Sequence, residues 1–398
     1  MRLRRYLEVL RTPGVGRVAL FALIGRLPFG TLPLSILLLM RQEHYEYGQI
    51  GAVLAAESLA VAVTAVIAAR LIDRLGQTAV LLVTGAVTGV VICGQALAIS
   101  EGAPVAVVVA LAAVQGAVIP PVSPSIRVLW KDLVPEERLE TAYAFDSVAL
   151  ELAFIVGPLI AAGLAAAWNP VAGVLLCAAL YSVAAFGFAT APASRSWKPA
   201  ENVVRTRAGA LGASGIRVLV MVAVLAAVSF GGLEVALTAF AEDEGSRGAV
   251  GPLITVWALG SVVGGLAYGA RTWKSPPPRR FLALSALLAL ANVPLPFAET
   301  VAVMGLFLFF TGLALAPLGA TEYALIADLA PGGTVTEAYS WLIAANTTGA
   351  AAGAFLAGIV IDHASLDWAL AIAPITCGLG LLAALAGRRA LVSSPAAV

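Results

Sequence analysis

The stretch D-L-V-P-E-E-R-L-E-T-A-Y-A-F at 132–145 recurs as D-L-A-P-G-G-T-V-T-E-A-Y-S-W at 328–341. The matched positions lie 196 residues apart (328 − 132), and the same offset joins Gly157 to Gly353 without a gap. That offset is close to half of the 398 residues. Internal repeats fix architecture before any local feature does. The chain is therefore predicted to consist of two related halves.

The composition is that of a membrane protein. Hydrophobic residues make up 60% of the chain, charged residues 12%, and the mean hydropathy is +0.95, whereas an average soluble domain carries roughly 25% charged residues. Cys93, Cys177 and Cys377 each lie in an apolar run and form neither a metal-ligand spacing nor a disulfide framework. No phosphate-binding G-x-x-x-x-G-K-[ST] loop occurs. We expect no metal, no cofactor, no nucleic-acid partner and no built-in ATPase.

Apolar runs of about 20 residues are long enough to span a bilayer as helices, and they recur along the whole sequence. The basic N-terminus lacks a small-residue cleavage site, so the first run is interpreted as a retained span. The predicted spans are 17–40, 48–69, 78–99, 103–126, 139–167, 171–192, 217–240, 249–270, 280–298, 300–326, 335–361 and 368–387. Prolines 120, 121 and 124 are expected to distort the span 103–126, and Pro317 the span 300–326.

Charges in the connectors predict the orientation. With a cytoplasmic N-terminus, nearly all arginines and lysines fall on the cytoplasmic side, and the outer connectors are acidic. The positive-inside rule then places both termini in the cytoplasm. The basic connector 193–216 is interpreted as a cytoplasmic linker between two six-helix halves, 1–192 and 217–398.

Twelve spans, a central basic loop and a half-chain repeat together resemble the major facilitator superfamily. The sharpest local match is A-R-L-I-D-R-L-G-Q at 69–77, similar to the family's G-x-x-x-D-R-x-G loop, with Asp73, Arg74 and Gly76 in place and Ala69 where glycine is usual. The resemblance implies a charged latch that holds cytoplasmic helix ends together in one state; an ordinary polar turn is the alternative. The second-half counterpart at 268–275 lacks the aspartate.

The stretch F-I-V-G-P-L-I-A-A-G at 154–163 looks like the glycine–proline motif of antiporters in this family. Gly157 and Pro158 match, but Ala161 and Ala162 stand where the fuller motif has glycines. Glycines also occur in membrane helices as plain packing sites. The resemblance is to twelve-helix drug/proton antiporter-type exporters, although the arginine expected before Gln115 is absent.

Ionisable residues inside spans are costly and mark functional sites by default. Arg26, Glu57 and Glu151 each lie about 9 to 12 residues into a span, roughly 14–18 Å deep at 1.5 Å per residue. The family fold implies that their helices surround a central cavity, where the three side chains could meet and couple transport to protons. A permanent structural ion pair is the alternative. Glu234 is interpreted as a second protonation site or as lining of the outer vestibule.

Other residues are assigned to gating or to the cavity. Asp146 is placed in a cytoplasmic gate, and Arg127 with Glu322 is proposed as a gate pair, with snorkelling to the interface as the alternative. Trp257, Trp341 and Asn346 are possible cavity lining, although packing and interfacial belts account for most membrane tryptophans.

The sequence thus favours a proton-coupled transporter, not an enzyme, that exports a small hydrophobic or amphipathic molecule by alternating access. The scarcity of polar residues in the spans disfavours a sugar carrier. Uptake or facilitated diffusion of a metabolite is the alternative within transport, and a non-transporting sensor or scaffold is the alternative from another class. An alanine- and arginine-rich, lysine-poor composition predicts the inner membrane of a bacterium, and we expect a functional monomer.

Overall fold

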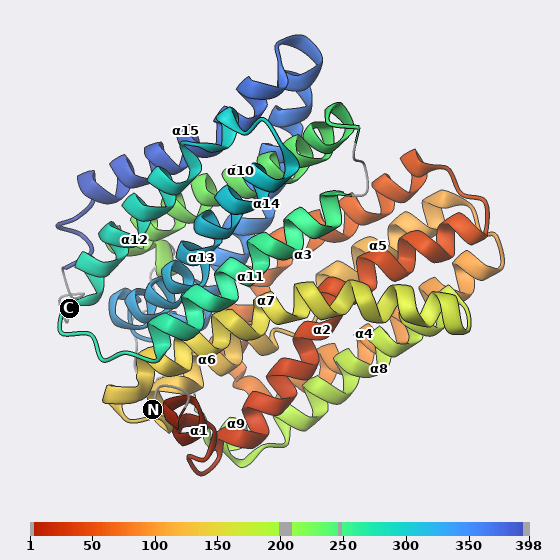
Figure 1. Ribbon diagram of the computed structural model, residues 1–398. Helices are drawn as coiled ribbons and strands as arrows, with labels where there is room; N and C mark the ends of the chain where they lie inside the picture. The colour runs from red at the N-terminus through yellow and green to blue at the C-terminus, as the bar shows by residue number, and fades with distance from the viewer. Residues whose placement is uncertain (1–3, 199–208, 246–248, 393–398) are drawn as a thin grey trace. The chain divides into compact units, whose positions relative to one another are not determined.

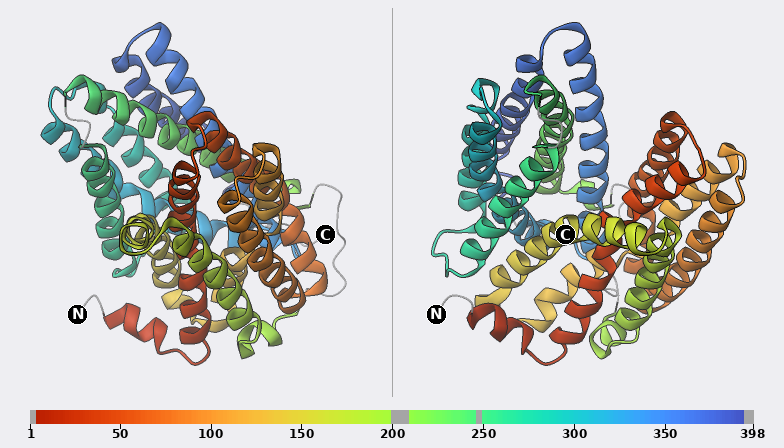
Figure 2. Two further views of the ribbon diagram at one scale, coloured as in Figure 1. Left: turned by 90° about the vertical axis from the view of Figure 1, so that its right-hand side faces the viewer. Right: turned by 45° about the vertical axis from the view of Figure 1, so that its right-hand side comes forward.

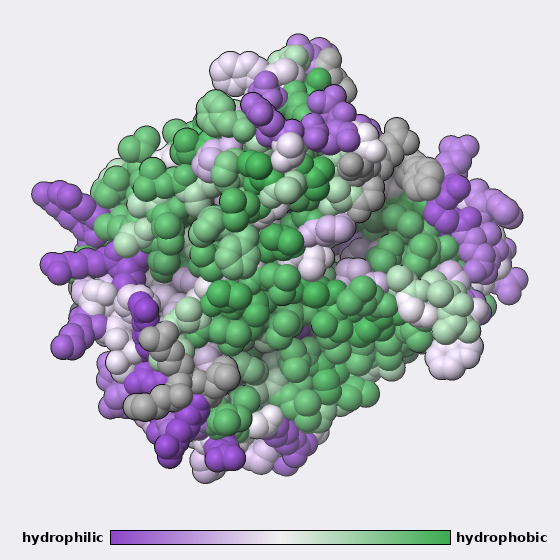
Figure 3. All heavy atoms as spheres, viewed as in Figure 1, coloured by the Kyte–Doolittle hydropathy of each residue, from purple (hydrophilic) through white to green (hydrophobic). Residues whose placement is uncertain are grey.

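The computed structural model describes residues 4–198, 209–245 and 249–392, and over these ranges the chain is all-helical (Figure 1). Within them, twelve helical segments are long and apolar enough to cross a membrane. The predicted all-α membrane fold with twelve spans is therefore confirmed. Hydrophobic residues cover the visible surface of the spans, and hydrophilic residues gather where the helices end (Figure 3).

The helices group into two compact units. The N-terminal unit comprises the described residues of Glu8–Pro135 and Leu152–Val203, and the C-terminal unit those of Met1–Leu7, Glu136–Glu151 and Val204–Val398. The N-terminal unit holds α2 (Val15–Gln42), α3 (Tyr47–Leu75), α4 (Gln77–Ser100), α5 (Val105–Val118), α6 (Val122–Leu133), α8 (Pro170–Ala189) and α9 (Pro192–Ser196). The C-terminal unit holds η1 (Gly209–Gly212), α10 (Ser214–Asp243), α11 (Val250–Gly269), α12 (Pro277–Asn292), η3 (Leu295–Phe297), α13 (Val301–Leu329), α14 (Val335–His363) and α15 (Leu366–Ala386).

Two helices contribute to both units. These are α1 (Arg4–Leu10) and α7 (Glu136–Ala167), which changes unit after Glu151. The division predicted from the sequence, at 1–192, 193–216 and 217–398, stays a prediction, and residues 199–208 of the expected linker lie outside the described residues.

One predicted span is broken. Proline lacks a backbone N–H and disfavours the helical conformation of the residue before it, and accordingly α5 ends at Val118 and α6 begins at Val122, on either side of Pro120 and Pro121. The Thr88 hydroxyl of α4 donates to the Val118 carbonyl at 2.6 Å, which satisfies an acceptor at the end of α5. The expected distortion by Pro317 takes a milder form, since α13 continues through it.

Helix pairs within each unit repeat the same packing. In the C-terminal unit α10 lies along α14 and α11 along α13, and in the N-terminal unit α3 lies along α5 (Figures 1 and 2). A Cβ at Gly116 of α5 would collide with the backbone carbonyl of Glu57, and a Cβ at Gly312 of α13 with that of Trp257. Gly116 and Gly312 are 196 residues apart (312 − 116), so Glu57 and Trp257 occupy the same place in the two repeats.

The repeated glycines of the sequence also serve close helix contacts. An added Cβ at Gly157 would meet the backbone of Gly30 and Thr31 on α2, and one at Gly353 would meet the backbone of Val228 and Gly232 on α10. Small residues at such crossings let membrane helices approach closely. Gly157 therefore has a packing role in the structure, and its antiporter role stays a prediction.

Candidate functional site

A polar group lies within the N-terminal unit around Glu57. Glu57 is in the middle of α3, and its carboxyl interacts with the amide of Gln115 on α5, which is fully buried. Neither amide atom of Gln115 reaches full hydrogen-bond geometry with any partner in the described part of the chain. A buried amide that is not fully bonded is costly. The pair therefore keeps bonding capacity for a proton, a water molecule or a ligand.

Two further helices border this group. Tyr181 on α8 is buried, packs edge-on against Phe29 of α2 at a ring distance of 6.3 Å, and lies within electrostatic range of Glu57. Arg26 is on α2 and only 1% exposed. The predicted meeting of Arg26 with Glu57 stays a prediction. Tyr181 and Gln115 had no place in the predicted site, because a polar residue in an apolar helix does not reveal its partner.

The C-terminal unit carries a second carboxyl of the same kind. Glu151 on α7 is half-buried and lies near the side chain of Ser261 on α11, which is fully buried. The Ser261 oxygen also accepts the backbone N–H of Ala316 on α13 at 3.2 Å. Ser261 thus links α11 to α13 beside Glu151. It is a further residue absent from the site predicted from the sequence.

An aromatic surface lies one turn from Glu234 on α10. Phe230 stacks on Trp257 of α11 with ring centroids 4.7 Å apart and an angle of 27°. Trp257 is buried, and its indole N–H finds no partner among the described residues. Phe230 is 45% exposed, and the Glu234 side chain is exposed on the next turn. The exposed ring at this place is that of Phe230, and the role of Trp257 as cavity lining stays a prediction.

The other two residues predicted to line the cavity, Trp341 and Asn346, differ in their surroundings. Trp341 donates its indole N–H to Glu337 at 3.3 Å, one turn before it on α14. That carboxylate also accepts the backbone N–H of Ala210 at 3.3 Å. Trp341 is therefore tied to the start of α14, whereas Asn346 is exposed further along the same helix.

The predicted latch turn lies between α3 and α4. Gly76 has φ +88°, a value that favours glycine. Asp73 is buried and Arg74 is exposed. Gln77 is fully buried, donates to the Ser125 carbonyl of α6 at 3.2 Å and accepts the Ser194 hydroxyl of α9 at 3.2 Å. The turn is thus fixed to two further helices of its own unit, α6 and α9.

The second-half counterpart of this turn is built around an arginine. Arg280 of α12 is 5% exposed and forms a salt bridge with Glu140 of α7. Its guanidinium also donates to the Tyr268 hydroxyl at 2.9 Å and lies over the rings of Tyr268 and Trp273, 5.7 and 5.9 Å from their centroids. The aspartate missing from 268–275 is thus replaced by a carboxylate from a distant helix. This pairing could not be predicted from the sequence, because the partners are 140 residues apart (280 − 140).

Side chains also complete the end of α11. The last carbonyls of a helix lack intrahelical partners. The Thr141 hydroxyl donates to the Gly269 carbonyl at 2.7 Å and the Trp273 indole to the Tyr268 carbonyl at 3.0 Å. The Tyr6 hydroxyl donates to the Gly265 carbonyl, one turn earlier, at 3.0 Å. This end of α11 is therefore bonded to α1, to α7 and to its own following loop.

The predicted gate residues Arg127, Asp146 and Glu322 are all buried, with Asp146 fully so. Buried charges are normally paired, which fits a gate. The proposed Arg127–Glu322 pair stays a prediction.

Pro158, the proline of the predicted antiporter motif, lies inside α7. Among the described residues, no three histidine, cysteine or acidic side chains are grouped as a metal site.

One comparison with known proteins identifies a family. The sequence profile of the Major Facilitator Superfamily matches residues 18–217 and 219–396. A comparison with curated protein sequences found no match.

Solved structures are similar over nearly the whole chain. The human organic anion transporter MFSD10 (TETRAN) has a TM-score of 0.74 and 19% identity over 94% of this chain and 99% of that one. A bacterial homologue of the iron transporter ferroportin in an outward-facing state with soaked iron gives 0.76 and 13% over 94% and 98%. The proton:xylose symporter XylE bound to 6-bromo-6-deoxy-D-glucose gives 0.71 and 14% over 92% and 94%. At these identities the similarity concerns the fold.

Proposed function

Because this chain belongs to the major facilitator superfamily, and is therefore a multi-pass membrane transporter, we propose that it exports a small hydrophobic or amphipathic molecule in exchange for protons. The two units would rock in alternating access, with Asp73, Arg74, Arg127, Asp146 and Glu322 in the gate. We place it as a functional monomer in the inner membrane of a bacterium.

The proposal rests on the partners of the two carboxyls in the spans. Glu57 faces the amide of Gln115, and Glu151 lies near the hydroxyl of Ser261. An amide or a hydroxyl can donate to a carboxylate and can also accept from a carboxylic acid, whereas arginine or lysine only donates. Both carboxyls therefore have a partner that suits either protonation state. Such a partner supports reversible proton binding, while a permanent ion pair would hold the carboxyl ionised.

The side chains around Glu234 support an apolar or amphipathic substrate. Around Glu234 the exposed neighbour is the Phe230 ring, itself stacked on Trp257. A carboxylate exposed to lipid in a span would be costly, so we assign this face of α10 to the substrate path. An aromatic face beside a carboxylate suits an amphipath with a cationic group.

Transport in proteoliposomes tests the proposal. We would impose an outward proton gradient or none, and follow ethidium, a fluorescent aromatic cation, together with a pH-sensitive dye inside the vesicles. Proton movement that depends on ethidium is expected for the unaltered protein. Glu57→Gln and Glu151→Gln should abolish the gradient-driven part, since neither amide titrates. Glu101→Gln, an exposed residue just after α4, is the control and should transport normally.

Three results would count against the proposal. Full gradient-driven transport by the Glu57→Gln and Glu151→Gln variants would exclude coupling through these carboxyls. Net movement of ethidium in the same direction as the protons would favour proton-driven uptake. If a wide panel of compounds produced neither flux nor stabilisation of the purified protein, a non-transporting sensor would be favoured.

A further inference from the structure

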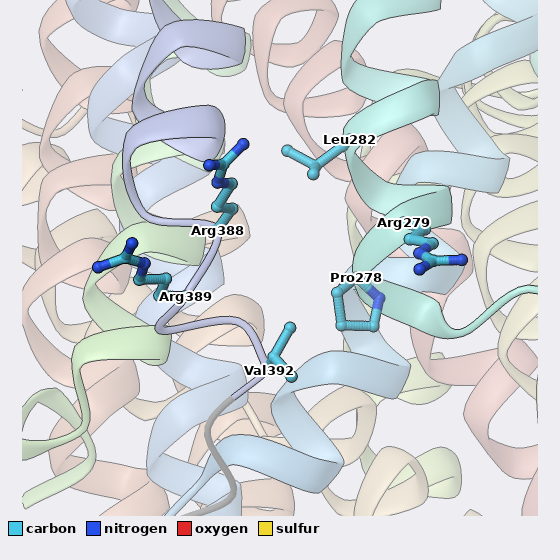
Figure 4. A pocket seen from close by; sticks show the side chains of 6 residues that line it. All are labelled: Pro278, Arg279, Leu282, Arg388, Arg389 and Val392. Carbon is cyan, nitrogen blue, oxygen red and sulfur yellow. The ribbon is translucent and has the colours of Figure 1, made fainter.

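A pocket of about 510 Å³ lies in the C-terminal unit, between the beginning of α12 and the end of α15. It is lined by Pro278, Arg279, Leu282, Arg388, Arg389 and Val392 (Figure 4). Half of the lining residues are arginines, half are apolar, and none is acidic. The pocket is distinct from the carboxyl sites and from the latch turn, and the proposed function does not use it.

The arginines are arranged around the opening of the pocket. Figure 4 shows the Arg388 side chain reaching between the helices toward Leu282, with the guanidiniums of Arg279 and Arg389 to either side and pointing away. Exposed side chains change rotamer in picoseconds to nanoseconds, so the exposed Arg279 can turn toward a bound anion. Among the described residues, neither Arg279 nor Arg388 pairs with a carboxylate, and both are exposed.

Arg280, the residue after Arg279, differs from it in having partners within the fold. Arg280 is turned inward, where Glu140 and Tyr268 bind it. Its charge is therefore compensated within the fold, while that of Arg279 is not. The first turn of α12 thus has one arginine that serves the fold and one that is available to a ligand.

The helices that lead to the pocket have apolar exposed faces. On α15, Leu379, Leu382 and Leu385 follow one another at helical spacing and are 49%, 62% and 42% exposed. On α12, Leu287 and Leu290 are 47% and 69% exposed. Leucines exposed to this degree on membrane spans contact acyl chains. The pocket is therefore an anion site at the end of a lipid-covered surface, on the side that the charge pattern predicts to be cytoplasmic.

We infer that this pocket binds the headgroup phosphate of an anionic phospholipid, with Arg388 as the central contact and Arg279 and Arg389 as flanking charges. Pro278, Leu282 and Val392 would contact the glycerol region, and the acyl chains would lie along α12 and α15. Basic pockets between membrane helices on the cytoplasmic side bind acidic headgroups in this way, and the planar guanidinium matches phosphate geometry.

Native mass spectrometry of the full-length protein, titrated with short-chain phosphatidylglycerol, tests the inference. Each arginine near an anionic membrane surface contributes about a fivefold gain in affinity. The Arg279→Gln/Arg388→Gln variant is therefore expected to bind phosphatidylglycerol roughly 25-fold more weakly. The matched control is Arg195→Gln/Lys198→Gln, which removes two exposed charges from the N-terminal unit and should bind normally. The charge-preserving Arg279→Lys/Arg388→Lys variant should retain most binding and shows that the positions tolerate substitution.

Two further titrations distinguish the ligand sources. Phosphatidylcholine of the same chain length and inorganic phosphate should each compete poorly with phosphatidylglycerol. If inorganic phosphate displaced the lipid at equal concentration, the pocket would be a free-anion site and the lipid assignment would be wrong. Equal losses in the pocket variant and the control would also overturn it, since general surface charge would then explain binding.

Discussion

Tyr143 and Tyr339, the matched tyrosines of the two repeats, contact each other. Their hydroxyls are 3.4 Å apart, and both side chains are buried. Tyr339 also donates to the Tyr323 carbonyl at 3.0 Å, and the Tyr323 ring packs edge-on against both tyrosines. The sequence repeat therefore brings its two copies together at one point, inside the C-terminal unit.

Removing the Tyr339 hydroxyl should destabilise the protein. Tyr339→Phe leaves the buried Tyr323 carbonyl without this donor, and a lost buried hydrogen bond costs about 1–2 kcal/mol. We expect a lower apparent melting temperature in detergent, measured by intrinsic fluorescence. Tyr181→Phe, a buried tyrosine of the other unit, serves as a comparison for tyrosine loss in general. An unchanged melting temperature for Tyr339→Phe would show that the contact does not stabilise the fold.

Substituting the glycines that pack against the backbone carbonyls of Glu57 and Trp257 should destabilise the protein. An added Cβ at Gly116 or Gly312 collides with the backbone of the neighbouring helix, and overpacking costs about 1–3 kcal/mol. Gly116→Ala and Gly312→Ala are expected to lower the melting temperature. Gly163→Ala is the control, because nothing lies within 4 Å of its added Cβ, and alanine favours the helix by about 1 kcal/mol. Equal behaviour of the three variants would contradict the close approach.

Arg280 and Glu140 should show energetic coupling. Hydrogen bonds to charged groups contribute about 1.5–3 kcal/mol, and Arg280 is buried while Glu140 is 27% exposed. In a double-mutant cycle of Glu140→Gln and Arg280→Gln, the two losses of stability should sum to more than that of the double variant. Glu137→Gln, exposed in the first turn of α7, replaces Glu140→Gln in the control cycle. Additive losses in both cycles would exclude a stabilising pair.

Ser261 and Ser285 form a natural comparison. Both are buried in the C-terminal unit, but the Ser261 oxygen accepts the Ala316 N–H and lies near Glu151, whereas the Ser285 hydroxyl has no partner among the described residues. Ser261→Ala is expected to cost about 1–3 kcal/mol and to reduce proton-coupled flux in vesicles. Ser285→Ala should leave both nearly unchanged. The reverse order would remove Ser261 from the proposed coupling site.

The number of membrane spans and the positions of the charged residues in them could be predicted from the sequence. Twelve apolar runs gave twelve spans, and Pro120 and Pro121 marked the break between α5 and α6. The partners of the charges could not be predicted. Gln115, Ser261 and Glu140 meet Glu57, Glu151 and Arg280 only through helix packing, and the side chain to which a lone amide or hydroxyl turns depends on helix rotation that hydropathy does not encode.

The buried Tyr6 hydroxyl predicts a loss of stability at alkaline pH. Tyr6 lies outside the spans, donates to the Gly265 carbonyl, and burial raises its pKa above the ordinary value of 10.0. Because the folded state holds this proton more tightly than the unfolded state, its contribution is fully present below about pH 10 and is lost as pH rises toward the folded pKa. The melting temperature of the unaltered protein should therefore fall between about pH 10 and 11 more steeply than that of Tyr6→Phe, which has no phenol to ionise. Parallel curves for the two proteins would show that Tyr6 is ionised as readily in the fold as in the unfolded chain, and that the bond to Gly265 does not hold α1 on α11.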